Sequence, residues 1–137
     1  MNPRKAFCCV LLVVTAMSTP AHADTYDALL SEFVSLLYER DMLEYLASEA
    51  NGEAVNLAGQ RTEILAAIAG LSNQLVDVAD LTMLASILAV ISIYESILDV
   101  VESDITQNHD TIADIQNDLE ATNKRIEALE NELSATS

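Results

Sequence analysis

The sequence has 137 residues, with 22 aspartates and glutamates against six lysines and arginines. Its net charge of −16 disfavours binding to nucleic acids, because that affinity depends on neutralising phosphates with lysine and arginine. Anionic lipid surfaces should repel the chain for the same reason. The length predicts a single domain.

Residues 1–23 have the layout of a cleavable secretory signal. Arg4 and Lys5 precede an apolar run that extends to Met17, and small residues follow up to Ala23. At 1.5 Å per residue this run is too short for a hydrocarbon layer of about 30 Å. We therefore expect cleavage after Ala23 and a secreted or periplasmic location.

The chain that follows, residues 24–137, offers few groups for catalysis. It contains no cysteine and one histidine, His109, and its 22 acidic residues against four basic ones give a net charge of −18. Covalent catalysis and zinc binding usually rely on cysteine and histidine, and no glycine-rich phosphate motif occurs. We expect no enzymatic activity, no metal site and no cofactor.

Two shorter helices are predicted before residue 70. Asp24 can cap a helix with apolar residues at three- and four-residue spacing, and Gly52 is expected to end it. A second helix is expected from about Glu53 to Ala69, followed by a stop at Gly70.

From Gln74 onward the sequence contains no glycine or proline, which permits one very long helix. Leucine or isoleucine recurs there every seven residues, at Leu84, Ile91, Leu98, Ile105, Ile112, Leu119, Ile126 and Leu133. The positions three residues later are Ile87, Tyr94, Val101, Asn108, Ile115, Thr122, Leu129 and Thr136. We call these two sets of positions the seam. Such a repeat predicts a left-handed coiled coil.

The apolar face of this long helix narrows along the chain. Between residues 81 and 101 the seam is accompanied by further apolar residues, namely Leu88, Val90, Ile93, Ile97 and Val100. Several neighbouring helices are needed to cover that much apolar surface. After Glu102 only the seam is apolar. The predicted fold is therefore all-α, with a helical head over residues 24–101, in which two shorter helices pack on the long third helix. That helix continues into a parallel coiled-coil stalk over residues 102–137.

The stalk is expected to assemble the chain into a homo-oligomer. Isoleucine and valine at both seam positions favour three or four strands, and we favour a trimer. Its predicted core consists of Leu98, Ile105, Asn108, Ile112, Ile115, Leu119, Thr122, Ile126, Leu129 and Leu133. Asn108 is interpreted as a device that fixes register and oligomer state, since a buried amide penalises shifted pairings. Between chains, Arg125 would lie beside Glu130 and Asp104 beside His109.

The segment ITQNHDTIADIQNDLEATNKRIEALENEL resembles stalk segments of trimeric autotransporter adhesins. The resemblance covers about 29 of the 137 residues, and the threonine that often follows the core asparagine in that family is His109 here. It implies that three Asn108 amides in a trimeric core could bind an anion.

Two other interpretations remain open. The uncharged run 81–94, with residues 64–71 before it, could form an apolar hairpin over 64–94 that enters a membrane, as in lytic or pore-forming proteins. Alternatively, a helix break near Asn108, with Thr111 as a new cap, would give a monomeric four-helix periplasmic sensor or chaperone. The interpretation that we favour is a non-enzymatic structural spacer, oligomerisation or interaction module, to which a protein partner could bind at the head.

Overall fold

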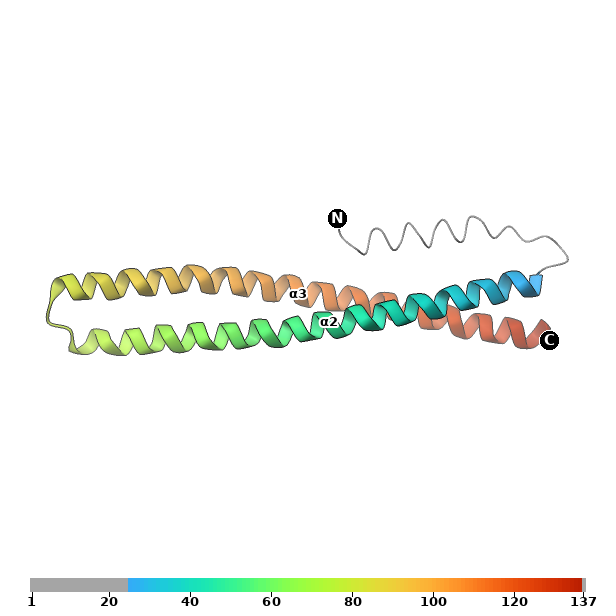
Figure 1. The fold of residues 1–137 in the computed structure, drawn as a ribbon, viewed down its shortest axis with the longest axis horizontal. Helices are drawn as coiled ribbons and strands as arrows, with labels where there is room; N and C mark the ends of the chain where they lie inside the picture. The colour runs from blue at the N-terminus through green and yellow to red at the C-terminus, as the bar shows by residue number, and fades with distance from the viewer. Residues whose placement is uncertain (1–24, 137) are drawn as a thin grey trace. The chain divides into compact units, whose positions relative to one another are not determined.

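The computed structural model describes residues 25–136, and the predicted export segment lies outside them. Two long α-helices, α2 (Thr25–Gln74) and α3 (Leu81–Thr136), contain nearly all of these residues (Figure 1). A short 3-10 helix, Leu75–Asp77, lies between them. The predicted all-α class is confirmed.

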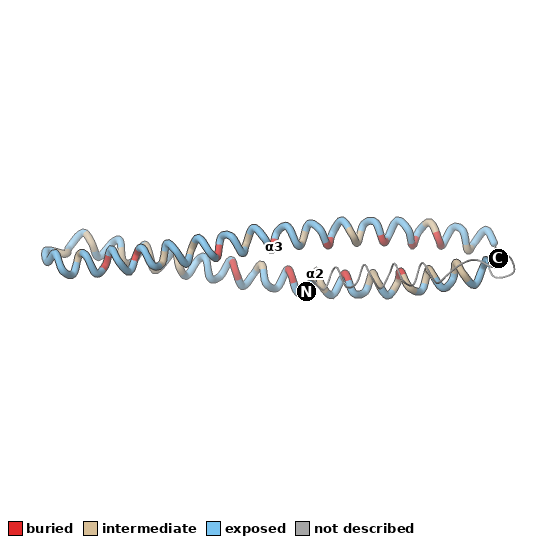
Figure 2. The backbone as a smooth tube through the Cα atoms, turned by 90° about the horizontal axis from the view of Figure 1, so that it is seen from above, coloured by how far each residue is buried: buried red, intermediate tan, exposed pale blue. Residues whose placement is uncertain are grey.

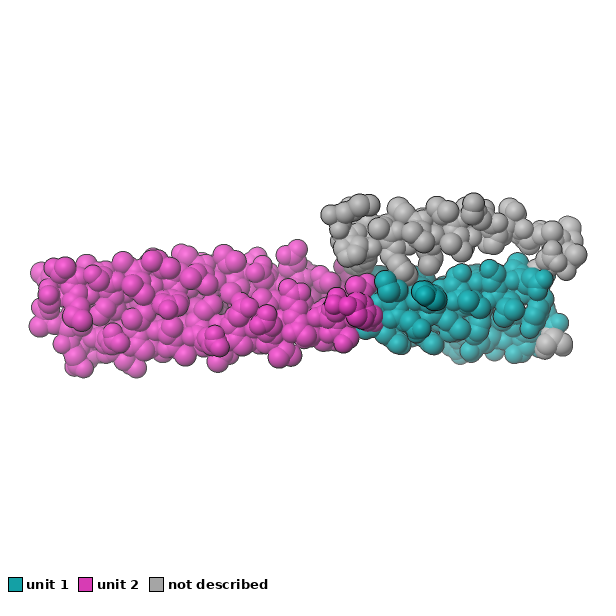
Figure 3. Space-filling view, viewed as in Figure 1, with its two compact units in different colours: residues 1–44, 117–137 teal, residues 45–116 magenta. Residues whose placement is uncertain are grey.

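The chain divides into two compact units (Figure 3). Among the described residues, unit 1 comprises 25–44 of α2 and 117–136 of α3, and unit 2 comprises 45–116. Each unit therefore contains one segment of each helix.

In unit 2 the two helices run antiparallel. Asn108 Nδ2 donates a hydrogen bond of 3.1 Å to the carbonyl oxygen of Ala50, and Arg61 Nε lies 3.2 Å from a carboxylate oxygen of Glu102. A later residue of α2 thus meets an earlier residue of α3.

In unit 1 the segments are also antiparallel, and an apolar cluster holds them together. Leu36 of α2 packs with Ile126 and Leu129 of α3, and Leu129 is fully buried. Leu29, Phe33 and Leu37 are partly buried against this cluster.

The buried residues of α3 all belong to the predicted seam, and the buried positions recur along one face of the helix (Figure 2). They are Ile87, Ile91, Val101, Asn108, Ile115, Thr122, Ile126 and Leu129. In the structure this face packs on α2 of the same chain. The parallel contact with further copies stays a prediction.

The expected helix end at Gly52 is wrong, since α2 continues through Gly52, Gly59 and Gly70. Each glycine costs a helix about 1 kcal/mol relative to alanine, which packing along the rest of the helix can offset. The four buried residues of α2 are Leu36, Leu43, Ala50 and Leu57, each seven residues after the last. The seven-residue spacing is the same before and after Gly52, from Ala50 to Leu57, so both residues lie on one buried face of α2 in unit 2. The expected head of two shorter helices is therefore replaced by a single helix.

The chain reverses between Leu75 and Asp80, where the sequence signals at Gly70 had suggested an earlier break. Val78 has an extended backbone, with φ −86° and ψ 118°. Asp80 then caps α3, because its side-chain oxygen accepts a hydrogen bond of 2.9 Å from the backbone N–H of Thr82. Its carbonyl oxygen accepts the bond from Leu84 N that opens the helix.

The alternative with four helical segments required a break near Asn108, and that break is wrong. Helix α3 is continuous from Leu81 to Thr136. The hydroxyl of Thr111 donates to the carbonyl oxygen of Gln107, four residues back, as within an uninterrupted helix. The helix also passes residue 101 without interruption, and the division into head and stalk stays a prediction.

Candidate functional site

Asn108 forms a polar layer within the apolar seam of unit 2. It is 7% exposed, and its amide nitrogen donates to the carbonyl oxygen of Ala50. The side-chain oxygen of Asn108 is buried and has no hydrogen-bond partner. Leaving a buried acceptor unsatisfied costs about 1–3 kcal/mol, so this layer exchanges stability for a fixed alignment of α2 and α3.

Open grooves lie on both sides of the Asn108 layer, because the residues opposite it on α2 are short. One groove has a volume of about 590 Å³ and is lined by Ala54, Ala58 and Arg61 of α2, with His109 among its α3 residues. The other has about 390 Å³ and is lined by residues that include Ala50, Glu53 and Asp104.

These surroundings bear on the predicted anion site. Within the chain, the amide of Asn108 already donates to Ala50, and Glu53 and Asp104 would repel an anion in the smaller groove. Arg61 is paired with Glu102 in the larger one. An anion held by three Asn108 side chains of different copies stays a prediction.

The residues predicted to form the oligomer core all lie on the face of α3 that packs on α2. The buried ones are Asn108, Ile115, Thr122, Ile126 and Leu129. The half-buried ones are Leu98, Ile105, Ile112, Leu119 and Leu133. The structure thus brings all ten to one face, where they contribute to packing within the chain.

Replacing Asn108 with isoleucine should raise the free energy of unfolding by about 1–2 kcal/mol, since it removes the unsatisfied oxygen and adds apolar contact in the seam. The carbonyl oxygen of Ala50 keeps its place in the helical hydrogen bonds of α2. We also expect a broader distribution of oligomer sizes, because without the polar layer nothing penalises shifted pairings in which α3 exchanges α2 for other copies.

Thermal melts followed by circular dichroism, together with light scattering, test the Asn108→Ile variant. Gln116→Ile is the matched control, because Gln116 is exposed, lies off the outer face that continues the apolar stripe, and its replacement should leave stability within about 0.5 kcal/mol. A variant at Asn108 that melted lower and stayed uniform in size would contradict the role in register.

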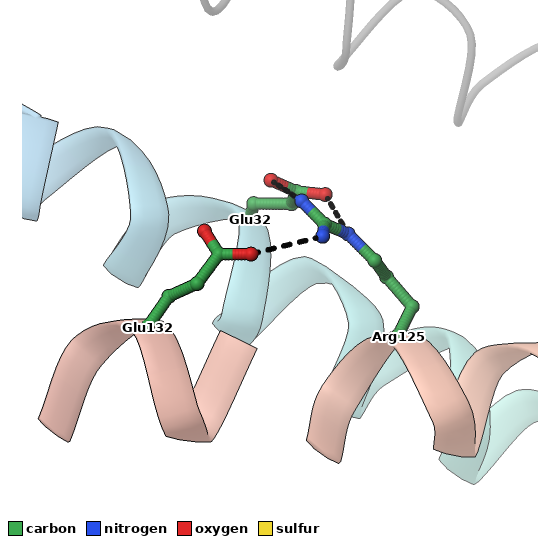
Figure 4. A network of polar contacts seen from close by, with 3 residues as sticks. All are labelled: Glu32, Arg125 and Glu132. Carbon is green, nitrogen blue, oxygen red and sulfur yellow. Dashed lines mark hydrogen bonds and ion pairs between the residues drawn. The ribbon is translucent and has the colours of Figure 1, made fainter. Parts of the chain in front are cut away.

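Arg125 joins the two helices of unit 1 through carboxylates (Figure 4). Its guanidinium donates to both carboxylate oxygens of Glu32, at 2.9 and 3.1 Å, and to Glu132 at 3.4 Å. The bond to Glu32 is the main cause that raises the pKa of Arg125. Arg125, predicted to lie beside Glu130 of another copy, therefore has partners within its own chain. The side chains are 30–47% exposed, so the network biases alignment and adds little stability.

Glu39, also in unit 1, provides a pH-dependent prediction. Partial burial, and then the charge of Asp118, raise the pKa of Glu39 above 4.5. The folded protein holds this proton more tightly than the unfolded chain does, so the free energy of unfolding falls as pH rises from 4.5 through the raised pKa. Glu39→Gln should therefore melt higher than the parent at pH 7, and the difference should vanish below about pH 4.

The pH dependence can be measured by thermal melts recorded between pH 3 and 8 at intervals of about one pH unit. Glu44→Gln is the control for the change in net charge, because Glu44 is exposed on the same helix. A difference between parent and Glu39→Gln that stayed constant with pH would exclude Glu39 as its source.

A second apolar surface lies beside the seam in unit 2. Its members are Met83, Ser86, Val90, Ile93, Ile97 and Val100, and we call this surface the outer stripe. The alternating three- and four-residue spacing places them on one face of α3. The five large side chains are 39–61% exposed. The apolar residues around this part of α3 predict several neighbouring helices, and within the described residues the outer stripe has none that buries it.

The segment that carries the outer stripe has few charges. Residues 81–94 of α3 contain no charged side chain, and neither do residues 64–76 of α2 and the 3-10 helix. Asp77 and Asp80 lie at the turn between them. By length and composition α3 could cross a membrane, and only 11% of its most apolar 18-residue window is buried.

Within residues 25–136, no group of three or more histidine, cysteine, aspartate or glutamate side chains is placed to hold a metal ion. Two features of this part of the chain bear on function, namely the Asn108 layer and the outer stripe. Comparison of the chain with protein-family models, with curated proteins and with solved structures gives no match.

Proposed function

We propose that the chain is an exported, non-enzymatic helical protein that works as an oligomerisation and interaction module, self-associating through the outer stripe of α3. The exposure of five large apolar side chains on one face carries this proposal. Contiguous apolar surface of this kind, with charged residues around it, is typical of protein interaction sites.

The distribution of charge supports a second copy as the partner. With a net charge of −18 over residues 24–137, two copies repel each other over most of their surface. Residues 81–94 carry no charge, so two copies can approach there with the least repulsion. The same acidity disfavours partners that are themselves acidic.

The energy of this contact is moderate. Burying the exposed half of a large apolar side chain contributes about 1 kcal/mol, so ten side chains from two copies contribute roughly 10 kcal/mol. Association costs about 4–15 kcal/mol in lost freedom. The difference is at most about 6 kcal/mol, so we expect weak self-association, with a dissociation constant of about 40 μM or higher. Added salt should strengthen it, because salt screens the acidic surfaces.

In the proposed oligomer each chain keeps α2 packed on α3, an arrangement that we call the α2–α3 hairpin. The seam that was predicted to form a parallel trimer is covered by α2, and a trimer built on the seam would require α3 to exchange α2 for other copies. An oligomer built on the outer stripe leaves the packing between α2 and α3 unchanged. Such a module can act as a spacer whose acidic outer surface keeps other macromolecules at a distance.

The test is the mass in solution, measured by light scattering on the protein recovered after export. We expect the mass to rise with concentration from one chain toward a defined oligomer, and the transition to move to lower concentration when salt is raised. A protein that remained monomeric at all concentrations and salt levels would overturn the proposal. A sharp trimer at every concentration would favour the seam over the outer stripe.

Membrane insertion is the second candidate function, favoured by the apolar window of α3, of which only 11% is buried. The uncharged run of fourteen residues reaches about 21 Å, short of a hydrocarbon core of about 30 Å. Release of dye from zwitterionic and anionic vesicles distinguishes the two functions. If the protein is monomeric and releases dye from zwitterionic vesicles, the result would support insertion. If it releases no dye and its mass rises with concentration, the result would support self-association.

A further inference from the structure

We infer that the outer stripe of one chain packs antiparallel on the outer stripe of a second copy, about a two-fold axis that passes between Val90 and Ile93. This inference rests on the proposed self-association and adds the orientation and register of the two copies. It follows from the spacing, the charges and the hydroxyl groups of the stripe.

The spacing of the outer stripe reads the same in both directions. From Met83 to Val100 the steps are three, four, three, four and three residues. Reversing one copy about the midpoint therefore places every member opposite another member. Met83 then faces Val100, Ser86 faces Ile97, and Val90 faces Ile93. A two-fold interface of this kind is self-complementary, as closed dimers require.

Charge selects the antiparallel orientation over the parallel one. The three- and four-residue spacing continues beyond Val100 through Asp104, Gln107, Thr111 and Asp114. In a parallel pair Asp104 and Asp114 would each face the same residue of the other copy, and such like charges oppose pairing. In the antiparallel pair residue 104 lies opposite residue 79 and beside Asp80 of the other copy, and the later residues of the series lie beyond the turn of that copy. Of this series only Asp104 then meets a like charge.

Two serines, one in the stripe and one on its edge, already have hydrogen-bond partners on their own helix. The hydroxyl of Ser86 donates to the carbonyl oxygen of Thr82 at 3.0 Å, and that of Ser96 donates to the carbonyl oxygen of Ser92 at 3.1 Å. Covering these hydroxyl groups therefore leaves no donor unsatisfied. Ser86, the one polar member of the stripe, can be buried opposite Ile97 at little cost.

Small residues along one edge of the stripe permit close approach of a second helix. Ala85, Ala89, Ser92 and Ser96 recur at three- and four-residue spacing, one position away from the stripe, and all are exposed. Small side chains let helix backbones approach closely and increase the contact of the larger neighbours. The edge therefore fits a helix of the second copy at short distance.

Disulfide formation between single-cysteine variants tests the orientation. The full chain is used with Cys8→Ser and Cys9→Ser, so that no native thiol takes part. Met83→Cys and Val100→Cys are prepared separately, one of them isotope-labelled, and are mixed and oxidised. Both positions are more than half exposed and should tolerate cysteine without loss of the fold. The mass in solution is measured first for each variant, to establish whether it self-associates.

The antiparallel pair predicts that the mixture forms the mixed disulfide at least about tenfold more than either variant forms its own, since a disulfide needs Cα atoms within about 7 Å. In that pair two copies of residue 83 are roughly 25 Å apart along the helix axis. Val55→Cys, 75% exposed on α2, reports the background from random collision.

The other outcomes separate this inference from the proposed function. An oligomer in which Met83→Cys and Val100→Cys each form their own disulfide has parallel stripes, which overturns the inference and leaves self-association standing. An oligomer in which no pair exceeds the Val55→Cys background uses another surface, which also overturns it. A monomer overturns the proposed function, and the inference with it.

Discussion

Leu129→Ala should lower the free energy of unfolding by about 2–4 kcal/mol, the largest effect expected of a single substitution in unit 1. Leu129 is 0% exposed and packs with Leu36 of α2 and Ile126 of α3. Removing its branched end takes apolar contacts from both helices at once and leaves a cavity. Two helices can move together and partly fill the cavity, so the largest loss of unfolding free energy expected here is smaller than the largest loss in a large core.

The loss can be located as well as measured. Denaturation followed by circular dichroism gives its size, and hydrogen exchange should show it concentrated in residues 25–44 and 117–136, which make up the described part of unit 1. Leu30→Ala, at a side chain 40% exposed on α2 in the same unit, should cost less than about 1 kcal/mol. Equal losses for the two variants would contradict the packing of α2 on α3 in this unit.

The buried face of α3 could be predicted from the sequence, but the helix that covers it could not. The seven-residue spacing from Leu84 to Leu133 identifies a face that must meet another helix. The same spacing results from a contact with α2 or with another copy of α3. Asn108 illustrates the point, because it was placed in the seam while its partner, the carbonyl oxygen of Ala50, required the register of the hairpin.

The continuity of α2 was missed although the sequence contains the signal for it. Leu29, Leu36, Leu43, Ala50, Leu57, Ile64 and Leu71 are all seven residues apart. The packing of these seven residues of α2 outweighs the cost of about 1 kcal/mol for a glycine inside a helix. An added Cβ at Gly52 would meet no atom within 4 Å. The spacing was therefore the better guide.

The outer stripe was only partly visible in the sequence. Apolar residues around most of α3 between 81 and 101 indicated several neighbours, and the structure shows which of them α2 leaves exposed. The division of an apolar helix into a covered and an uncovered face depends on where the partner helix lies. Periodicity alone does not give that position, because Val90 and Ile91 are both members of seven-residue series.

Ile93→Glu should convert the self-associated protein to monomers, with at least about a hundredfold weaker association, since an unpaired charge buried in an interface costs about 3–5 kcal/mol. Ile93 is 60% exposed in the hairpin and lies at the centre of the outer stripe. In the antiparallel pair a single substitution places two carboxylates beside the two-fold axis. The fold of the hairpin should be unchanged, because glutamate is a good helix former at an exposed position.

Light scattering and sedimentation over a range of concentrations measure this dissociation, and thermal melts of the dilute protein show whether the hairpin remains folded. Val55→Glu is the matched control, because it adds the same charge at an apolar side chain 75% exposed on α2. If Val55→Glu dissociated the protein as strongly as Ile93→Glu, net charge would be the cause and the outer stripe would not be the contact. If only Ile93→Glu dissociated it, the contact would lie on α3, because repulsion between acidic chains acts equally on both variants.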